Sequence, residues 1–457
     1  MKNKLFNIFI YVISILITIS FLLKLSIFKY LNSFIWAIGT IGILSSGIFL
    51  SYKLGFPQLN FKGMLRSLKS NDKSNDGVST FEALSLSLGA RVGVGSLAGV
   101  ALAIYLGGPG TILWMWVTVF ISSSNTLTES VLGVIYQNKD TLNINVGGPS
   151  YYIKKGMGNN GLAIFYAIMI IISYILGFLT IQSNTIVKSV NTVVNIKPLI
   201  IILIISLCTY LVIFKGVKKI ASFSSYVVPL MGIIYIIIGM FIVIKNIAIM
   251  PSIIGLIFKS AFNFKSFFGG FLGTFIIGIQ KCLFSNESGL GTSAISSSTT
   301  NDKPIKQGYV QVLGIYITTL VVCTITALII LTCNYETLSL TDVNGIEITS
   351  YAFKYHLGNF GNILLLIIVI LFAFSTIISG YYYGESSLKF LKPNISKKCL
   401  NVFKIISIIL ISLGGIVSSN VIWSLVDIFV VILIIVNIYA ILHLYKDVRY
   451  TQIIDKK

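Results

Sequence analysis

The chain has 457 residues, of which 55% are hydrophobic and 11% charged, and its mean hydropathy is +0.91. Soluble domains carry about 25% charged residues, so this composition excludes a soluble globular protein and indicates a polytopic membrane protein. The formal net charge is +20, and with two histidines and five scattered cysteines the chain has too few ligands for a His/Cys metal cluster.

Apolar runs long enough to cross about 30 Å of hydrocarbon predict an all-α protein with about twelve spans, if each broken segment counts once. The first run has the length of a signal peptide, but no small-residue cleavage site follows it, so we interpret it as a retained helix. In chain order the predicted spans cover residues 5–27, 34–54, 80–106, 109–136, 163–188, 197–214, 222–246, 267–300, 307–333, 361–388, 400–418 and 420–444.

Basic residues are distributed unevenly around these spans. With the N-terminus in the cytoplasm, most of the 34 lysines and arginines fall in or beside cytoplasmic segments. Because positive charge favours the cytoplasmic side, this asymmetry predicts a multi-pass protein of the plasma (inner) membrane with both termini cytoplasmic. The excess charge is then a topology signal, so we expect a lipid-embedded monomer without a nucleic-acid partner.

The predicted span 80–106 breaks two rules for a membrane helix. Its stretch SLSLGARVGVGSL contains Arg91 among the glycines at 89, 93 and 95. Glycine weakens a helix and a charge in lipid is costly. Unwinding at glycine also frees backbone N–H and C=O groups that need partners at membrane depth, and a substrate or ion can supply them.

The predicted span 267–300 carries a matching pattern. Its ESGLGT (287–292) aligns with RVGVGS (91–96), and a charged residue, Arg91 or Glu287, stands two positions before the first glycine of each. Close helix packing is the simpler explanation of a single GxG, but two matched copies favour a shared function. The charges are expected to pair with each other or to gate a pathway, since intramembrane charges usually find partners.

Five predicted spans begin at each motif, and an odd number inverts the second copy in the membrane. This is the pattern of an inverted-repeat secondary transporter, whose binding site lies at two broken helices. We therefore divide the chain into an N-terminal two-helix segment with a cytoplasmic loop (1–79), a first inverted repeat (80–246), an extracellular linker (247–266), a second inverted repeat (267–445) and a cytoplasmic tail (446–457).

Longer blocks around these motifs resemble the alanine or glycine:cation symporter family. GARVGVGSLAGVALAIYLGGPGTILWMWV is similar to the family's GNIAGVA and GGPGAxFWMWV, and further similar blocks follow in the same order: VGGPSYYIKKGMG, IQSNTI, CLFSNESGLGTSAIS and FAFSTIISGYYYGE. The resemblance implies a leucine-transporter-type fold of five plus five inverted helices. It also implies sodium-driven uptake of small neutral amino acids.

The resemblance assigns two sets of binding residues. Hydroxyl and carbonyl oxygens suit a hard cation, so it implies a sodium ion at Gly89, Val92, Ser375 and Thr376, although hydroxyls in membrane helices commonly bond to their own preceding turn. We expect the amino acid to bind at the glycine-rich breaks and the residues facing them, with a simple interhelical hydrogen bond as the alternative for Gln182. These substrate-binding residues are Gly93, Gly95, Ser96, Gln182, Asn286, Gly289, Gly291 and Gly380.

The sequence departs from the family at three places. Ser96 replaces an asparagine, and SAISSS replaces SAPIAHA. Gly380 falls where relatives tend to carry a tryptophan, which predicts room for a substrate larger than alanine.

Other function classes fit less well. The sequence shows no nucleophile–base arrangement of the kind that an enzyme would need. A channel would need a continuous polar pore, whereas the polar groups here concentrate around the two broken helices. A scaffold protein would carry a soluble domain, which the short loops do not provide. A proton-coupled symporter using Glu287 remains the alternative, because proton coupling normally uses a titratable residue in the membrane.

Overall fold

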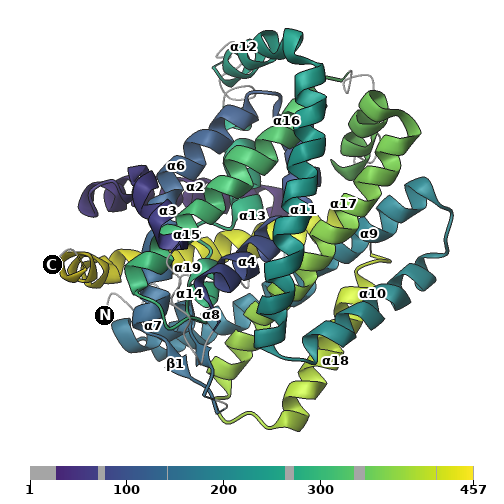
Figure 1. Ribbon diagram of the computed structural model, residues 1–457. Coiled ribbons are helices and arrows are strands. Elements are labelled where there is room, and N and C mark those ends of the chain that lie inside the picture. The colour runs from purple at the N-terminus through teal and green to yellow at the C-terminus, as the bar shows by residue number, and fades with distance from the viewer. Residues whose placement is uncertain are drawn as a thin grey trace.

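The computed structural model describes residues 27–69, 78–141, 143–262, 272–333, 345–417 and 419–455. Within these residues the chain is built almost entirely of helices (Figure 1). The predicted span 5–27 lies outside the described residues, except for Ile27. Residues 263–271, which include the start of the predicted second repeat, also lie outside them.

The helices fall into two groups along the chain. The first group is α2 (Ile27–Lys53), α3 (Phe61–Lys69), α4 (Thr80–Arg91), α5 (Val100–Gly107), α6 (Thr111–Ile135), α7 (Pro149–Met157), α8 (Asn160–Ile172), α9 (Leu179–Val193), α10 (Pro198–Ile213), α11 (Val217–Lys245) and α12 (Met250–Ala261). The second group is α13 (Leu272–Asn286), α14 (Thr292–Ser297), α15 (Pro304–Tyr316), α16 (Thr324–Leu331), α17 (Gly345–Leu391), α18 (Lys397–Leu413) and α19 (Ser419–Ile454).

Shorter elements connect or interrupt these helices. Among the residues that the structure describes, three π-helical segments continue into α-helices: η2 (Gly95–Gly99), η3 (Ser173–Phe178) and η7 (Ile317–Cys323). In the described part of the chain, two 3₁₀ turns, η1 (Pro57–Leu59) and η4 (Ile247–Ile249), lie in connections. One antiparallel pair, β1 (Asn138–Lys139) with β2 (Asn145–Val146), follows α6.

Membrane-crossing helices are clear in part of the chain. Six helices of the described residues are long and apolar enough to cross a bilayer, and a seventh is the bent pair of α4 with η2–α5, which meet at 53°. The helix α6 fails this criterion because residues 122–130 contain a single apolar side chain, Leu127, and all nine are buried in the bundle. The protein is thus a multi-pass membrane protein, and the count of twelve spans stays a prediction.

Each predicted span from residue 34 onward coincides with a helix or with a broken pair of helices. Hydropathy missed the short helices α3, α7 and α12, the last of which occupies part of the predicted linker 247–266. It also missed the helical stretch before Gly358, where α17 bends at a positive φ of 64°. These pieces are too short, or too mixed in polarity, to give a span-like hydropathy signal.

The broken helices α4 and α13–α14 lie inside the bundle. The helix α4 packs against α11, α14, α15 and α17, while α13 and α14 pack against α6. Figure 1 shows α11 running along the molecule from the end that carries α7, β1 and the start of α18 to the end that carries α12. Each break therefore has several helices from which polar partners can reach it.

Both breaks follow from local backbone chemistry. The helix α4 begins with a capping box between Ser79 and Glu82 and ends at Arg91, and Val92 then has a non-helical ψ of 71°. After α13, φ is +55° at Glu287, +77° at Gly289 and +83° at Gly291. Glycine adopts positive φ without a steric cost, so the glycines permit this second break.

Candidate functional site

The structure brings the two breaks into contact. Ser96 Oγ lies 3.0 Å from Ser285 Oγ at the end of α13. A Cβ placed on Gly95 would lie 2.9 Å from the ring of Phe284 and 3.2 Å from the Ser285 Cα. The absence of a side chain at Gly95 therefore allows the backbone of the first break to approach the second break closely.

Three of the four predicted sodium residues, Gly89, Ser375 and Thr376, lie together, whereas Val92 forms the cap at the end of α4. The Gly89 carbonyl accepts hydrogen bonds from Thr376 Oγ1 (2.9 Å) and Ser375 Oγ (3.3 Å) of α17. A Cβ on Gly93 would stand 2.3 Å from Thr376 Oγ1. Both hydroxyls also donate to the Phe372 carbonyl of their own helix. The hydrogen bond within the helix and the contact with the first broken helix are therefore present together.

Gln182 of α9 contacts the first break. Its Oε1 accepts a hydrogen bond of 3.1 Å from the Val94 N–H, one of the backbone groups that unwinding frees. Asn286 belongs to the second break, where its Oδ1 accepts from the Ser288 N–H (3.0 Å) and its Nδ2 donates to Thr319 Oγ1 (3.1 Å). Both amides therefore stabilise non-helical backbone at membrane depth.

The three π-helical segments lie around these breaks. The segment η2 directly follows the first break, η3 supplies Tyr174, which donates to Glu287, and η7 supplies Cys323, whose Sγ lies 3.2 Å from Ser285 Oγ. Such π-bulges often occur at functional sites because they re-aim side chains within a helix. No simple hydropathy pattern predicts them.

Comparison with known proteins identifies the family of the chain. Residues 22–453 match the model of the sodium:alanine symporter family. The chain belongs to this family. It is 36% identical over 422 residues to the amino-acid carrier protein AlsT of Bacillus subtilis, covering 92% of this chain and 89% of AlsT. It is also 36% identical over 424 residues to the probable sodium/glutamine symporter GlnT of the same organism, covering 91% and 87%.

The fold of this symporter is similar to that of MhsT, solved in complex with L-phenylalanine. The TM-score is 0.51 at 15% identity, and the match covers 80% of this chain and 98% of MhsT. This likeness confirms the leucine-transporter-type fold class, although it does not establish the repeat boundaries. The family and its relatives are transporters, which confirms that the protein is not an enzyme.

The expected direct pair of Arg91 and Glu287 is not formed. Arg91 instead donates to Ser293 Oγ (2.5 Å) and the Gln311 carbonyl (3.5 Å), whereas Glu287 accepts from Tyr174 (2.7 Å) and Thr292 (2.9 Å). The reason is geometric: equivalent positions in two inverted motifs are related by symmetry, which does not make them neighbours.

If Arg91 and Glu287 were direct partners, exchanging their charges would restore activity; because they are not, we expect no recovery. Arg91→Glu combined with Glu287→Arg should not recover the activity lost in Arg91→Gln or Glu287→Gln, because a glutamate at 91 would face the Gln311 carbonyl, which only accepts. Initial rates of alanine uptake in proteoliposomes measure this. Recovery by the swap to more than half of the wild-type rate would instead indicate direct pairing.

A second buried carboxylate was missed by sequence reasoning. Glu129 of α6 is fully buried, and its Oε2 accepts from the Gly291 N–H (2.9 Å) and from Asn437 Nδ2 (2.7 Å) of α19. The same Asn437 Nδ2 donates to the Gly289 carbonyl (2.9 Å). Glu129 thus fixes the glycines of the second break, and its sequence signal was a lone acid inside the predicted span 109–136.

Gly380 lies in a filled region. A Cβ at Gly380 would stand 2.8 Å from Leu179 and 3.1 Å from the ring of Tyr174, the residue that donates to Glu287. Any side chain at position 380 would therefore crowd Leu179 and Tyr174 at its Cβ atom. A larger substrate side chain can enter only if they move, and the wider pocket stays a prediction.

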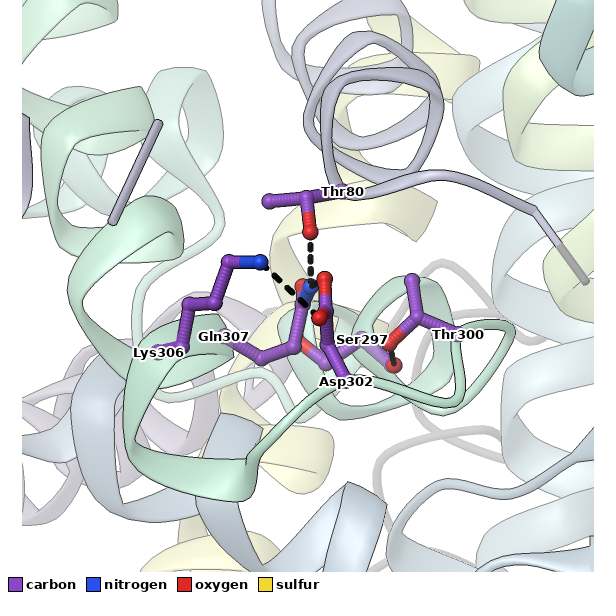
Figure 2. Close-up of polar contacts among 6 residues, drawn as sticks. All are labelled: Thr80, Ser297, Thr300, Asp302, Lys306 and Gln307. Atoms are coloured by element: carbon purple, nitrogen blue, oxygen red, sulfur yellow. Dashed lines mark hydrogen bonds and ion pairs between the residues drawn. The ribbon is translucent and has the colours of Figure 1, made fainter. Parts of the chain in front are cut away.

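A small polar cluster joins the start of α4 to the loop between α14 and α15 (Figure 2). Gln307 at the start of α15 donates to Thr80 Oγ1 (3.2 Å) at the start of α4 and to Asp302 Oδ2 (3.4 Å). Asp302 also pairs with Lys306 at 2.9 Å. Because Thr80 and Gln307 are buried, these contacts tie the first broken helix to the loop between α14 and α15.

Proposed function

We propose that the protein is a sodium-coupled symporter that carries small neutral amino acids into the cell by alternating access. The main support is the meeting of the Gly89 carbonyl with the hydroxyls of Ser375 and Thr376, directly beside the point where both broken helices touch. Oxygen donors of this kind suit sodium. Family membership supports sodium and alanine as the cargo.

The substrate would bind as a zwitterion between the two breaks. Its carboxylate would face the backbone N–H groups near Gly95 and Ser96, replacing the present bond from the Ser96 N–H to the Gly93 carbonyl (3.1 Å). Its amine would face acceptors near Asn286 and the carbonyls of residues 287–291. Gln182 would add a polar contact at the edge of this space.

The proposed topology keeps the sequence-based arrangement. Two inverted repeats, 80–246 and 267–445, form the carrier, joined by an extracellular linker (247–266). The segment 1–79 and the tail 446–457 lie outside it, with both termini in the cytoplasm of a plasma-membrane monomer.

A proton-coupled symporter is the second candidate. Two buried carboxyl groups, Glu287 and Glu129, lie at the second break and provide titratable groups at membrane depth. Uptake of radiolabelled alanine, glycine and glutamine into proteoliposomes distinguishes the candidates. Sodium coupling predicts uptake under an inward sodium gradient at equal pH, whereas uptake driven by a pH gradient without sodium would overturn it.

Thr376→Val should weaken the response to sodium. The substitution keeps the shape of the side chain but removes an oxygen at the proposed ion site, so we expect the half-saturating sodium concentration to rise about tenfold, the effect of one charge-assisted contact. Thr209→Val is the control, because the Thr209 hydroxyl is buried on α10 and has no hydrogen-bond partner among the described residues. Equal sodium dependence in the two variants would remove Thr376 from the site.

Gln307→Leu should open the end of the carrier shown in Figure 2 more often. Alternating access requires α4 to separate from α15, and the variant loses the bonds to Thr80 and Asp302, each worth about 1 kcal/mol. Cys323, buried beside Ser285, reports opening through its rate of maleimide labelling in a variant whose other cysteines are serine. We expect labelling several-fold faster, with Thr192→Val, which loses a bond to Ser189 within α9, as the unchanged control.

A further inference from the structure

A cavity of about 300 Å³ lies away from the broken helices, where α7 and β1 meet the end of α17. Lys139 of β1, Lys154 and Lys155 of α7, and Lys389 of α17 line it. Tyr151 and Phe390 form part of its wall, with their rings edge to face at 5.0 Å. The lining therefore combines rigid aromatic surface with four cationic side chains.

The charges of this cavity are not balanced. Asp140 is the acidic residue in its lining, and Lys389 already pairs with it and with Glu385, at 3.1 Å each. Lys154 lies over the Phe390 ring at 5.6 Å, and Lys155 donates to the Gln137 carbonyl at 3.2 Å. Among the described residues, Lys139, Lys154 and Lys155 have no carboxylate within ion-pair distance, so the cavity keeps an excess of positive charge.

We propose that this cavity binds a phosphate group. Lysine is a common point-charge ligand of phosphate, and basic pockets beside membrane helices on the cytoplasmic side recognise lipid headgroups. In the proposed topology this end of the molecule is cytoplasmic. The phosphate then comes either from an anionic phospholipid of the inner leaflet or from a free phosphate compound, and both present the same chemistry to the lysines.

The position of the cavity connects it to transport. Lys389 and Phe390 lie in the last turn of α17, and the same helix carries Ser375 and Thr376 earlier in its sequence. An anion in the cavity attracts Lys389 and competes with Asp140 and Glu385 for it, which changes how the end of α17 is held. Phosphate binding thus biases the carrier through this helix. This second step rests on the proposed transport function, whereas the binding itself does not.

The variant Lys154→Gln/Lys155→Gln tests the binding. Both side chains are exposed, so the fold should be kept, and the control Lys218→Gln/Lys219→Gln removes two exposed lysines at the start of α11, outside the cavity. The purified full chain is titrated in detergent with inorganic phosphate and, separately, with short-chain phosphatidylglycerol against phosphatidylcholine. Thermal shift and native mass spectrometry are the readouts.

We expect wild type and control to bind one of the two phosphate probes about 25-fold more tightly than the cavity variant, at about fivefold for each lysine. Preference for phosphatidylglycerol assigns the site to lipid, and preference for inorganic phosphate assigns it to a free compound. Equal binding by all three proteins, or none by wild type, overturns the proposal. If the cavity variant loses phosphate binding but keeps normal uptake, the binding site is supported and its link to transport through α17 is rejected. If the wild type shows no uptake, the proposed transport function fails, but the binding result still stands.

Discussion

Gly95→Leu is expected to abolish amino-acid binding and transport. The Cβ atom of any side chain at this position would lie 2.9 Å from the Phe284 ring and 3.2 Å from the Ser285 Cα. Phe284 cannot simply turn away, because it stacks on Phe178 at 5.1 Å and packs against Trp423 at 4.7 Å. A leucine must therefore push the two broken helices apart, which removes the backbone approach that the proposed carboxylate site needs.

Gly99 provides a matched control four residues further along the same broken helix. A Cβ at Gly99 meets the same Phe284 ring, but at an ordinary contact distance of 3.7 Å. Gly99→Ala should therefore keep most of the uptake, whereas Gly95→Ala should already lose much of it. Equilibrium binding of labelled alanine to purified protein, with the melting temperature as a check on folding, measures both. Near-normal affinity in Gly95→Leu would refute the placement of the substrate at this break.

The sequence predicted where the helices break because the backbone requirement is local. Unwinding at membrane depth needs residues that tolerate positive φ or close approach, and glycine meets that need in RVGVGS and ESGLGT alike. The meeting of Gly89 with Thr376 followed from the family resemblance. Composition alone could not pair residues so far apart along the chain.

The network around each break was harder to predict. Arg91 and Glu287 do not pair directly, because aligned motif positions say nothing about distance, and the gating alternative stays a prediction. Arg91 donates to Ser293 and the Gln311 carbonyl, and Glu287 accepts from Thr292 and Tyr174. Glu129 escaped notice because an average over a span conceals a single acid. Its partner Asn437 lies in the last predicted span, and only the tertiary structure brings them together.

Glu129→Leu is expected to stop transport and to lower the thermal stability of the protein. The variant leaves the Gly291 N–H without its acceptor and removes one of the two acceptors of Asn437 Nδ2. Each unsatisfied buried polar group lowers the free energy of unfolding by about 1–3 kcal/mol. In this variant the unsatisfied groups lie in the second break, which is also part of the proposed substrate site. We expect initial uptake to fall at least about tenfold and the melting temperature to drop.

Glu129→Gln separates the hydrogen bonds of Glu129 from its charge. The amide keeps one oxygen that can accept from Gly291 or Asn437, so a purely positioning role predicts sodium-driven uptake within a few-fold of wild type and a nearly normal melting temperature. Glu347→Gln, at a partly exposed site near the start of α17, controls for the loss of a carboxylate elsewhere. If the glutamine variant is as inactive as the leucine variant yet melts normally, the negative charge itself is required. A purely positioning role would then be refuted, and the result would favour the proton-coupled candidate in which Glu129 titrates.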